Sequence, residues 1–193
     1  MGAAELLARA FHHDPFLCWA EPDAARRPRT LATIYRSLLA GAARHEACLV
    51  EPRVGSVDWK APEHLELGPL EVLASGAWRV ALVAPPAVWW RRARHEGQAM
   101  ARVRAHLDAR TAYLGTLGVD PGIQGLGHGG RLLERGVSAM ARRWTACVLR
   151  TEQPRALPFY RRHGFELVDE SVCPVSALRV WVLRRTLGQP QGP

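Results

Sequence analysis

The chain has 193 residues and a net charge of +8, and 48% of its residues are hydrophobic against 23% that are charged. This composition suits one globular domain with a sizeable core. We expect no membrane span, because the sequence has no apolar run of about 18 residues. We also expect no signal peptide, because the N-terminus lacks a basic start and an apolar centre. Both absences predict a cytoplasmic protein.

The positive charge would suit an acidic partner. The sequence has no zinc finger, RNP signature or isolated basic arm, so we do not expect nucleic-acid binding. His12 and His13 resemble a metal cluster only at first sight, because neighbouring residues at a helix end point apart. The cysteines lack the spacing of a metal site or a disulfide framework, and we expect free thiols at Cys18, Cys48, Cys147 and Cys173. No metal is expected.

The first half of the chain is predicted to be helical around one hairpin. Helices are expected over 3–11 and within 22–44, and the apolar segments 47–50 and 54–60 are predicted to pair as short antiparallel strands. The helical segment 68–106 is broken at Gly76 and at Pro85-Pro86. Residues 16–19 have two interpretations, a wall of a binding pocket or an apolar plug under a loop.

Strand and helix signals alternate in the second half. The apolar run 113–119 indicates a buried strand that ends at Asp120-Pro121-Gly122, because proline cannot donate to a strand ladder. We expect a helix over 127–143, a strand over 145–150 and a short helix that stops at Gly164. Strands from Phe165 and over 178–183 form an antiparallel hairpin. This order predicts a mixed α/β sheet.

A glycine-dense loop, QGLGHGG at 124–130, joins the 113–119 strand to the next helix. Backbone N–H groups at a helix N-terminus lack intrahelical partners, and glycines let an anion approach them closely. The loop therefore predicts a phosphate site, with a tight turn that only allows close packing as the alternative. No lysine follows the glycines, so the loop is no P-loop. A Rossmann fingerprint fits poorly, because no acidic residue follows at the required spacing.

Two motifs together resemble the GNAT superfamily of N-acetyltransferases. The glycine loop matches the family's Q/R-x-x-G-x-G/A pattern after a strand that ends in Val-Asp-Pro. The downstream segment 154–165, PRALPFYRRHGF, resembles the second family signature, a short helix ending in F-Y-x-x-x-G-F. Residues 113–166 look most like the puromycin N-acetyltransferase group of small-molecule enzymes.

The resemblance implies the GNAT fold, a mixed central sheet flanked by helices, here with the first strand missing. It also implies that the strand before the loop splays from its neighbour and that acetyl-CoA lies in the gap as acyl donor. Backbone groups of the strand and loop would hold this cofactor. The implied cofactor-binding residues are Leu117, Gly118, Val119, Gln124, Gly125, Leu126, Gly127, His128, Gly129, Gly130 and Tyr160.

Tyr160 is the implied general acid, because a tyrosine hydroxyl with a pKa near 10 can protonate a thiolate whose thiol has a pKa of about 8.5. The general base is open. Many family members carry a carboxylate on the strand before the loop, where this chain has Gly115-Thr116. Glu152 is the candidate catalytic base, acting through a water, and His106 and Asp108 are further candidates.

Two positions depart from the puromycin-type pattern. Arg150 stands where those enzymes have an acidic residue, and Ala156 stands where they have an asparagine that commonly touches the cofactor. Arg150 would favour an acceptor with a carboxylate or phosphate over a cationic amine. We expect Arg150 and Trp59 to contact the acceptor.

The predicted function is acetyl transfer from acetyl-CoA to a primary amine of a small molecule. Attack would be direct, because no cysteine or serine stands in an activated constellation. The alternatives are a GNAT-fold protein that binds acyl-CoA without turnover, and an N-terminal acetyltransferase of peptides or proteins. We expect one domain over 1–187 with its cofactor-binding core at 112–168, a disordered tail at 188–193, and a monomer or homodimer.

Overall fold

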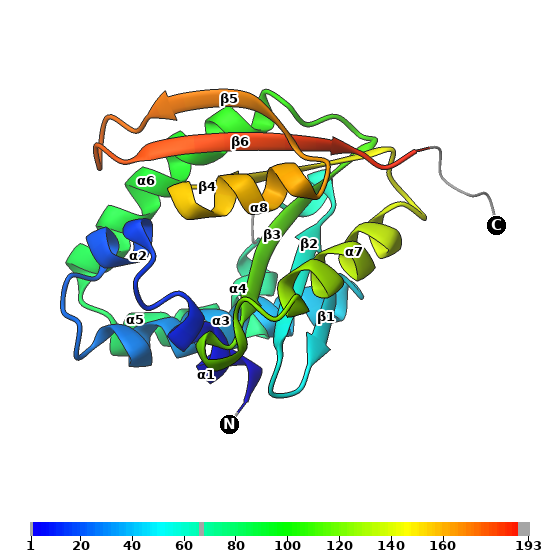
Figure 1. Cartoon of the computed structure of the whole chain (residues 1–193). Coiled ribbons are helices and arrows are strands. Elements are labelled where there is room, and N and C mark those ends of the chain that lie inside the picture. The colour runs from blue at the N-terminus through cyan, green and yellow to red at the C-terminus, as the bar shows by residue number, and fades with distance from the viewer. Residues whose placement is uncertain (1, 66–67, 189–193) are drawn as a thin grey trace.

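The computed structural model describes residues 2–65 and 68–188. Its centre is a six-stranded sheet in the order β1-β2-β3-β4-β6-β5, flanked by helices (Figure 1). All neighbouring strands are antiparallel except β3 and β4, which are parallel. The predicted mixed α/β sheet is therefore confirmed. The strands are β1 (Cys48–Glu51), β2 (Gly55–Lys60), β3 (Thr111–Val119), β4 (Ala146–Thr151), β5 (Glu166–Val172) and β6 (Arg179–Thr186).

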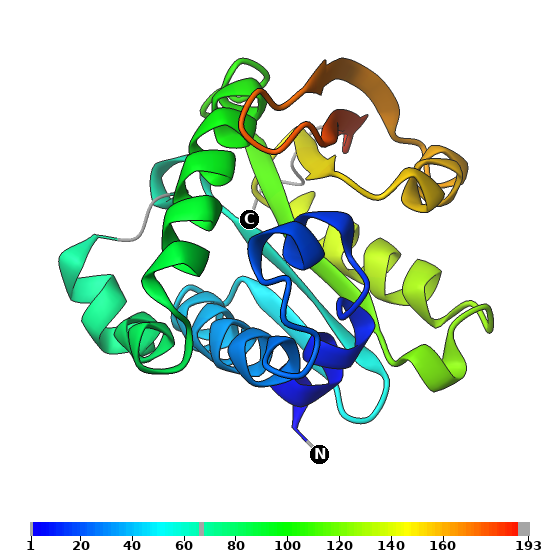
Figure 2. The same cartoon turned by 90° about the vertical axis from the view of Figure 1, so that its left-hand side faces the viewer.

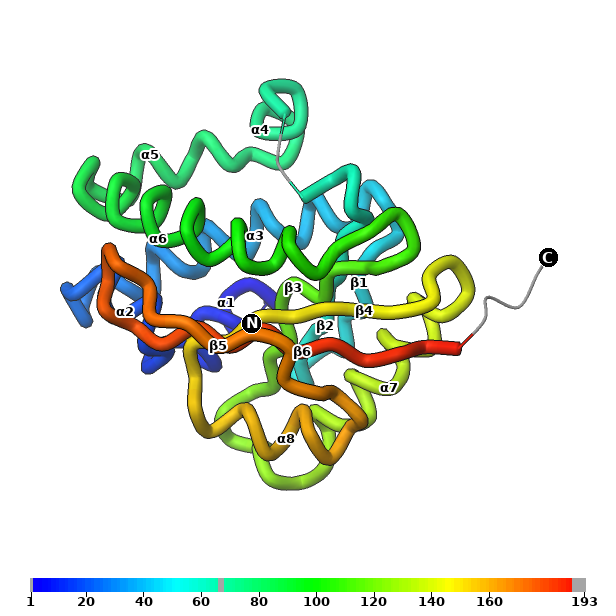
Figure 3. The backbone as a smooth tube through the Cα atoms, turned by 90° about the horizontal axis from the view of Figure 1, so that it is seen from above, coloured from blue at the N-terminus to red at the C-terminus, as the bar shows by residue number. Residues whose placement is uncertain are grey.

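Helices cover both faces of this sheet. Helices α3, α4, α5 and α6 lie on one face, and α7 and α8 lie on the other (Figure 3). No described helix combines the length and the apolar character that crossing a membrane requires. The α-helices are α1 (Ala3–Ala10), α2 (Pro15–Ala20), α3 (Arg27–Arg44), α4 (Pro69–Ser75), α5 (Val80–Val83), α6 (Pro86–Arg104), α7 (His128–Met140) and α8 (Leu157–Arg162), and the 3-10 turns are η1 (Pro62–His64), η2 (Ala77–Arg79), η3 (Pro121–Ile123) and η4 (Pro154–Ala156).

Most elements lie within a few residues of their predicted positions. Gly76 ends α4 with a φ of 74°, and Pro85-Pro86 separates α5 from α6. Helix α2 is not among the predicted helices, although Asp14-Pro15 indicates a helix start. The Asp14 carboxylate accepts a hydrogen bond from the Leu17 N–H at 3.1 Å, and proline suits a first helical turn.

The ends of the chain bear on two further expectations. In the described residues no strand precedes α1, so β1 forms one edge of the sheet. The predicted disordered tail lies outside the described residues, apart from Gly188. The predicted boundaries of the domain and of its cofactor-binding core remain predictions.

The main core lies between the sheet and α7. It contains buried side chains from β2, β3, β4 and α7, among them Val57, Leu114, Leu133, Met140 and Leu149. Cys147 of β4 is fully buried in this core, as the sequence predicted, and all four cysteines are free. A second cluster joins α1, α2 and α3. The two clusters fix the sheet and the N-terminal helices that enclose the site.

Strands β3 and β4 separate part-way along their length. They pair only over Thr111 to Tyr113, opposite Ala146 to Val148. Beyond this point β3 continues to Val119 against β2, and β4 continues to Thr151 against β6. Figure 1 shows β3 running away from β4 and β6. The splay that the resemblance implied is therefore present, and it leaves backbone hydrogen-bonding groups on both facing edges without strand partners.

Helix α1 packs closely on the splayed part of β3. A Cβ atom on Gly118 would overlap Leu7 Cδ2 and would lie 2.8 Å from a ring carbon of Phe11. Arg9 of α1 also forms an ion pair with Asp120, just after β3. Glycine at position 118 therefore allows the helix to cover the strand.

Replacing Gly118 by valine should destabilise the protein, because α1 would have to move away from β3. We expect a loss of about 1–3 kcal/mol in the free energy of unfolding, measured by urea denaturation. Gly97 is the matched control, since it is an exposed glycine within α6 whose Cβ would meet nothing within 4 Å. Gly97→Ala should stabilise the protein by up to about 1 kcal/mol. Parent-like stability of Gly118→Val would contradict the close packing of α1.

Candidate functional site

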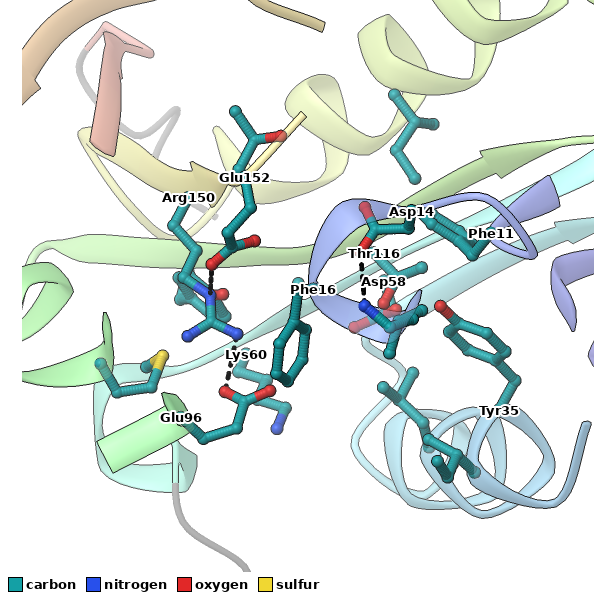
Figure 4. A pocket seen from close by; sticks show the side chains of 18 of the residues that line it. Phe11, Asp14, Phe16, Tyr35, Asp58, Lys60, Glu96, Thr116, Arg150 and Glu152 are labelled. Carbon is teal, nitrogen blue, oxygen red and sulfur yellow. Dashed lines mark hydrogen bonds and ion pairs between the residues drawn. The ribbon is translucent and has the colours of Figure 1, made fainter. Parts of the chain in front are cut away.

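A cavity of about 240 Å³ lies in the opening between β3 and β4. Strand β3 lines it with Gly115, Thr116 and Leu117, and the end of β4 lines it with Arg150, Thr151 and the following Glu152. Helices α1, α2, α3, α6 and α8 and strand β2 supply the other walls. Figure 4 shows that most of the labelled side chains in this cavity are polar or charged. Of the two residues expected to contact the acceptor, Arg150 lies here.

Asp58 of β2 is buried in this cavity without a hydrogen-bond partner. The residue is 1% exposed, and neither carboxyl oxygen has a partner among the described residues. Strand β3 carries an extra residue, Gly115, opposite the step from Asp58 to Trp59. A Cβ atom on Gly115 would overlap Asp58 Oδ2. The glycine in this β-bulge therefore makes room for the carboxyl group.

Burial raises the pKa of Asp58 to about 7. Thr116, its register partner on β3, lies close enough to lower this pKa through weak hydrogen bonding, although neither carboxyl oxygen has a hydrogen bond of ordinary geometry, and the Lys60 ammonium also lowers it. A carboxyl group with this pKa gains and loses a proton near neutral pH, which is the property that a general acid or base needs. Burial also raises the pKa of Asp14 to about 6, but that carboxylate caps α2 through the Leu17 N–H.

Charged side chains beside the end of β4 form one buried network. Arg150 Nη2 donates to Glu96 Oε2 at 2.7 Å, and Arg150 Nε lies 3.5 Å from Glu152 Oε1. On the other side of Glu152, His95 Nε2 lies 3.1 Å from the same oxygen, and His95 Nδ1 lies 2.9 Å from Ser176 Oγ. The carboxylate of Glu152, the candidate base, is therefore held by two partners.

The network also defines the surroundings of Arg150. Its side chain is 8% exposed, and the carboxylates of Glu96 and Glu152 balance its charge. Its Nη1 atom is buried and has no hydrogen-bond partner in the described part of the chain. One N–H donor group is thus left for an oxygen atom of a bound molecule.

Helix α2 supplies an apolar wall of the cavity. Phe16 and Leu17 both line it, and both are buried. The Phe16 ring stacks on His95 with centroids 4.3 Å apart, and the Arg92 and Arg150 guanidinium groups lie 5.3 and 5.8 Å from its centre. Both interpretations of residues 16–19 therefore apply, since the segment lines the pocket and fills the space beside it.

Tyr160 of α8 lines the same cavity. Its ring lies 5.2 Å from Phe159 and 5.5 Å from Phe165, centroid to centroid. Burial raises the pKa of the Tyr160 hydroxyl well above its ordinary value near 10. The hydroxyl therefore keeps its proton at neutral pH. The structure thus brings a protonated phenol and the Asp58 carboxyl group into one cavity.

The glycine loop has left-handed backbone at two glycines and ends at a helix N-terminus. Gly125 and Gly127 both have a φ of 82°, which side-chain-bearing residues rarely adopt. Gly127 is the N-cap of the 13-residue helix α7, whose first N–H groups lack intrahelical partners. Gln124 Nε2 donates to the Val119 carbonyl at 3.0 Å, which fixes the loop to the end of β3.

The remaining loop residues have packing or surface positions. A Cβ atom on Gly129 would lie 3.7 Å from the Phe159 ring, and one on Gly130 would lie 3.0 Å from His163. Leu126 is 65% exposed, and His128 Nδ1 lies 2.8 Å from Arg131 Nη2.

A second cavity of about 690 Å³ lies between α3, α6 and β2. Figure 2 shows α6 in green and α3 in light blue on the same side of the sheet. Trp59, the other residue expected to contact an acceptor, lines this cavity and not the first. The cavities adjoin, since both are lined by Ile34, Leu38, Lys60, Leu65, Arg92 and Glu96.

Three groups beside the second cavity have the geometry to hold a metal ion. His45, His64 and Glu71 present ligand atoms within 4.8 Å of one another, and all three line the cavity. Their spacing in the sequence matches no metal motif, so the sequence alone does not predict this group. His106 and Asp108, in contrast, line neither cavity. They lie before β3, at the end where it still pairs with β4.

A family model described as an acetyltransferase (GNAT) domain matches residues 86–167. The matched stretch runs from α6 through β3, the glycine loop and α8 to the start of β5. The match covers less than half of the chain and contains both motifs that carry the resemblance. The structure of PH1933 from Pyrococcus horikoshii OT3 has a TM-score of 0.57 to this chain, at 12% identity over 95% of it and 90% of that protein. The implied GNAT fold is confirmed.

Two named acetyltransferases are similar over shorter stretches of this chain. Nourseothricin acetyltransferase has 19% identity and a TM-score of 0.37, and the match covers 40% of this chain and 51% of that one. The ribosomal-protein-S18-alanine N-acetyltransferase from Escherichia coli has 19% identity and a TM-score of 0.37, with 43% and 58% covered. The chain therefore spans little more than half the length of either enzyme.

The sequence does not predict Asp58. The expected position of the family carboxylate is on β3 itself, where this chain has Gly115-Thr116. The structure supplies a carboxyl group from the neighbouring strand, in register with Thr116. The available signal was an acidic residue in the middle of a short apolar strand, next to a glycine-containing strand in the same sheet.

The raised pKa of Asp58 predicts how stability depends on pH. The folded-state pKa exceeds the unfolded value of about 4, so the folded state binds more protons between roughly pH 4 and pH 7, and stability falls as the pH rises through this range. Between about pH 5 and about pH 8, Asp58 should lower the free energy of unfolding by about 2–3 kcal/mol. Urea unfolding of Asp58→Asn at both pH values should lack this loss.

The exposed aspartate Asp23 offers the control, because Asp23→Asn should keep the parent's dependence on pH over the same range. If Asp58→Asn and the parent lose the same stability on going to the higher pH, Asp58 does not carry the raised pKa.

Proposed function

We propose that this domain transfers an acetyl group from acetyl-CoA to a primary amine of a small molecule. One observation carries the proposal. The opening between β3 and β4 brings together unpaired strand backbone, an unpartnered carboxyl group with a pKa of about 7 and a protonated phenol, and it leads to the glycine loop. Each of these parts has a place in direct acetyl transfer.

Acetyl-CoA would bind as acyl donor across the loop and the opening. Its pyrophosphate would accept hydrogen bonds from backbone N–H groups of residues 124–130 at the α7 N-terminus. Its pantetheine arm would pair with the β3 edge at Leu117, Gly118 and Val119, where β4 no longer pairs. The fit rests on backbone geometry, because Gly125 and Gly127 hold positive φ angles and the β3 edge lacks a partner strand.

Asp58 would act as the general base. A primary amine is mostly protonated at neutral pH, and the deprotonated Asp58 would take one proton from it. The nitrogen lone pair would then attack the thioester carbonyl carbon, so that a C–N bond forms. We prefer Asp58 to Glu152 because Glu152 is held by His95 and Arg150, whereas Asp58 has no histidine or arginine partner in the described residues and only Thr116 and Lys60 act against its raised pKa.

Collapse of the tetrahedral intermediate would break the C–S bond, and Tyr160 would give its proton to the departing thiolate. The amide nitrogen would lose its second proton, which would restore the Tyr160 hydroxyl, and Asp58 would release its proton to solvent. Burial keeps Tyr160 protonated at neutral pH but also makes it a weaker acid, so its proton would pass only as the thiolate forms beside it. Arg150 Nη1 would donate to an oxygen atom of the bound substrates. Because Glu96 and Glu152 balance its charge, Arg150 would favour anionic acceptors less than its charge alone suggests.

Acetyl-CoA should raise the melting temperature of the protein. A ligand at about 100 times its dissociation constant stabilises by about 2.7 kcal/mol, which corresponds to a shift of about 5–10 °C at this size. Gly127→Ala should reduce the shift, because alanine does not readily keep the required φ. Gly122→Ala in the preceding turn η3 is the control and should keep it, since Gly122 is not among the positive-φ glycines. No shift with the parent would contradict donor binding.

Release of free thiol with a panel of primary amines measures the reaction. Asp58→Asn and Tyr160→Phe should each lower kcat by about 10²–10⁴-fold and keep the thermal shift with acetyl-CoA. The parent rate should rise with pH through about 7 as Asp58 loses its proton, and this step should vanish in Asp58→Asn.

Other charged residues line the same cavity, namely Asp14, Lys60, Arg92, Arg150 and Glu152. Because burial raises the pKa of Asp14 to about 6, the variant Asp14→Asn shows how much of the pH dependence of the rate comes from Asp14. Asp23→Asn, at an exposed site, should match the parent in rate and pH profile. Parent protein that binds acetyl-CoA but turns over no amine would favour the alternative, binding without catalysis.

A further inference from the structure

The second cavity is a separate feature of this chain with its own chemistry. It adjoins the first along a boundary that includes Lys60 and Arg92. The first cavity, at about 240 Å³, has room for an amino group and an acetyl group but not for a large substrate. The second, at about 690 Å³, lies within the range of roughly 300–1,000 Å³ that holds drug-sized ligands.

The walls of the second cavity are mainly apolar. Trp59 and Trp144 are 5% and 7% exposed, and Trp89 of α6 lines the cavity as well. Small aliphatic side chains fill the spaces between these rings, including Ala42, Ala47, Ala61, Val80 and Ala93. Such walls bind a ligand through buried apolar area and aromatic contact.

The charged residues around the second cavity are predominantly basic. Lys60 and Arg92 stand at the boundary with the first cavity, and Arg44 and Arg143 also line the second. The acidic residues there are Glu96, which pairs with Arg150 at 2.7 Å and more loosely with Arg92 at 3.9 Å, and Glu71, which lies 3.2 Å from His45. A substrate with several positive charges would meet these cations, whereas an uncharged apolar body would not.

We infer that the acceptor is a monoamine with a large apolar or aromatic body. The body occupies the second cavity, and the amino group extends past Lys60 to Asp58 in the first. This inference rests on the proposed function and specifies its substrate class. It disfavours polyamines, whose additional cations Lys60 and Arg92 would repel.

A series of amines tests the substrate class. The probes are ethylamine, hexylamine, 2-(1-naphthyl)ethylamine and spermidine, and the readout is kcat/KM from thiol release. We expect a gain of roughly threefold to fourfold per added methylene group, and a naphthyl compound about 100-fold better than ethylamine. Spermidine should be poorer than hexylamine.

Two variants that fill the cavity from opposite walls test the location. Ala93→Phe adds a ring from α6, and Gly41→Leu adds a side chain from α3, where the nearest atom to a new Cβ is Ser75 Cβ at 3.8 Å. Each should lower kcat/KM for the naphthyl amine at least about tenfold and leave that for ethylamine within about twofold, because the lost buried area concerns only the large body. Gly97→Phe, one turn further along α6 and outside both cavities, should change neither.

The outcomes separate this inference from the proposed function. Equal use of ethylamine and the naphthyl amine, a preference for spermidine, or unchanged selectivity in both filling variants would overturn the substrate class while acetyl transfer stands. If no amine releases thiol, the proposed function fails. Calorimetry with the naphthyl amine and CoA then tests whether the second cavity binds such an amine at all. Binding by the parent that Ala93→Phe abolishes would support this assignment of the cavity, and no binding by the parent would overturn it.

Discussion

The end of pairing between β3 and β4 after Tyr113 is the constraint on which the rest of the site depends. Unpaired backbone groups in a protein interior need other partners. Here β2 holds one strand and β6 holds the other, so the gap between them persists. The bulge at Gly115 admits the Asp58 carboxyl group to this gap, and the close approach of α1 at Gly118 covers one side of it. The cavity, the carboxyl group and the exposed strand edge therefore have one structural origin.

The two buried carboxyl groups considered for the proposed role of base have different neighbours. Glu152 has His95 and Arg150 beside it. Asp58 is buried with no such partner in the described residues, and its pKa rises to about 7. An unpaired buried carboxyl group lowers stability at high pH. A cost of this kind is common where a group must exchange protons.

The two halves of the chain contribute different parts of the proposed enzyme. The stretch that matches the GNAT model, 86–167, contains the glycine loop, the opening and Tyr160. Asp58 and much of the second cavity come from residues that precede this stretch, including α3 and Trp59. The groups proposed to bind the donor therefore lie within the matched stretch, whereas much of the proposed acceptor side lies outside it. This division explains why the resemblance predicted acetyl-CoA readily and the acceptor only in outline.

The sequence by itself determined the features that depend on neighbouring residues. The glycines at 125 and 127 occupy the positive-φ positions that a tight loop before a helix requires, and apolar periodicity placed nearly every strand and helix. Tertiary structure alone decided which side chains meet. Asp58 reaches Gly115 through strand pairing, Glu96 reaches Arg150 from α6, and the two cavities arise between distant helices. Burial and the pKa shifts it causes are properties of this assembled arrangement, so no local pattern in the chain encodes them.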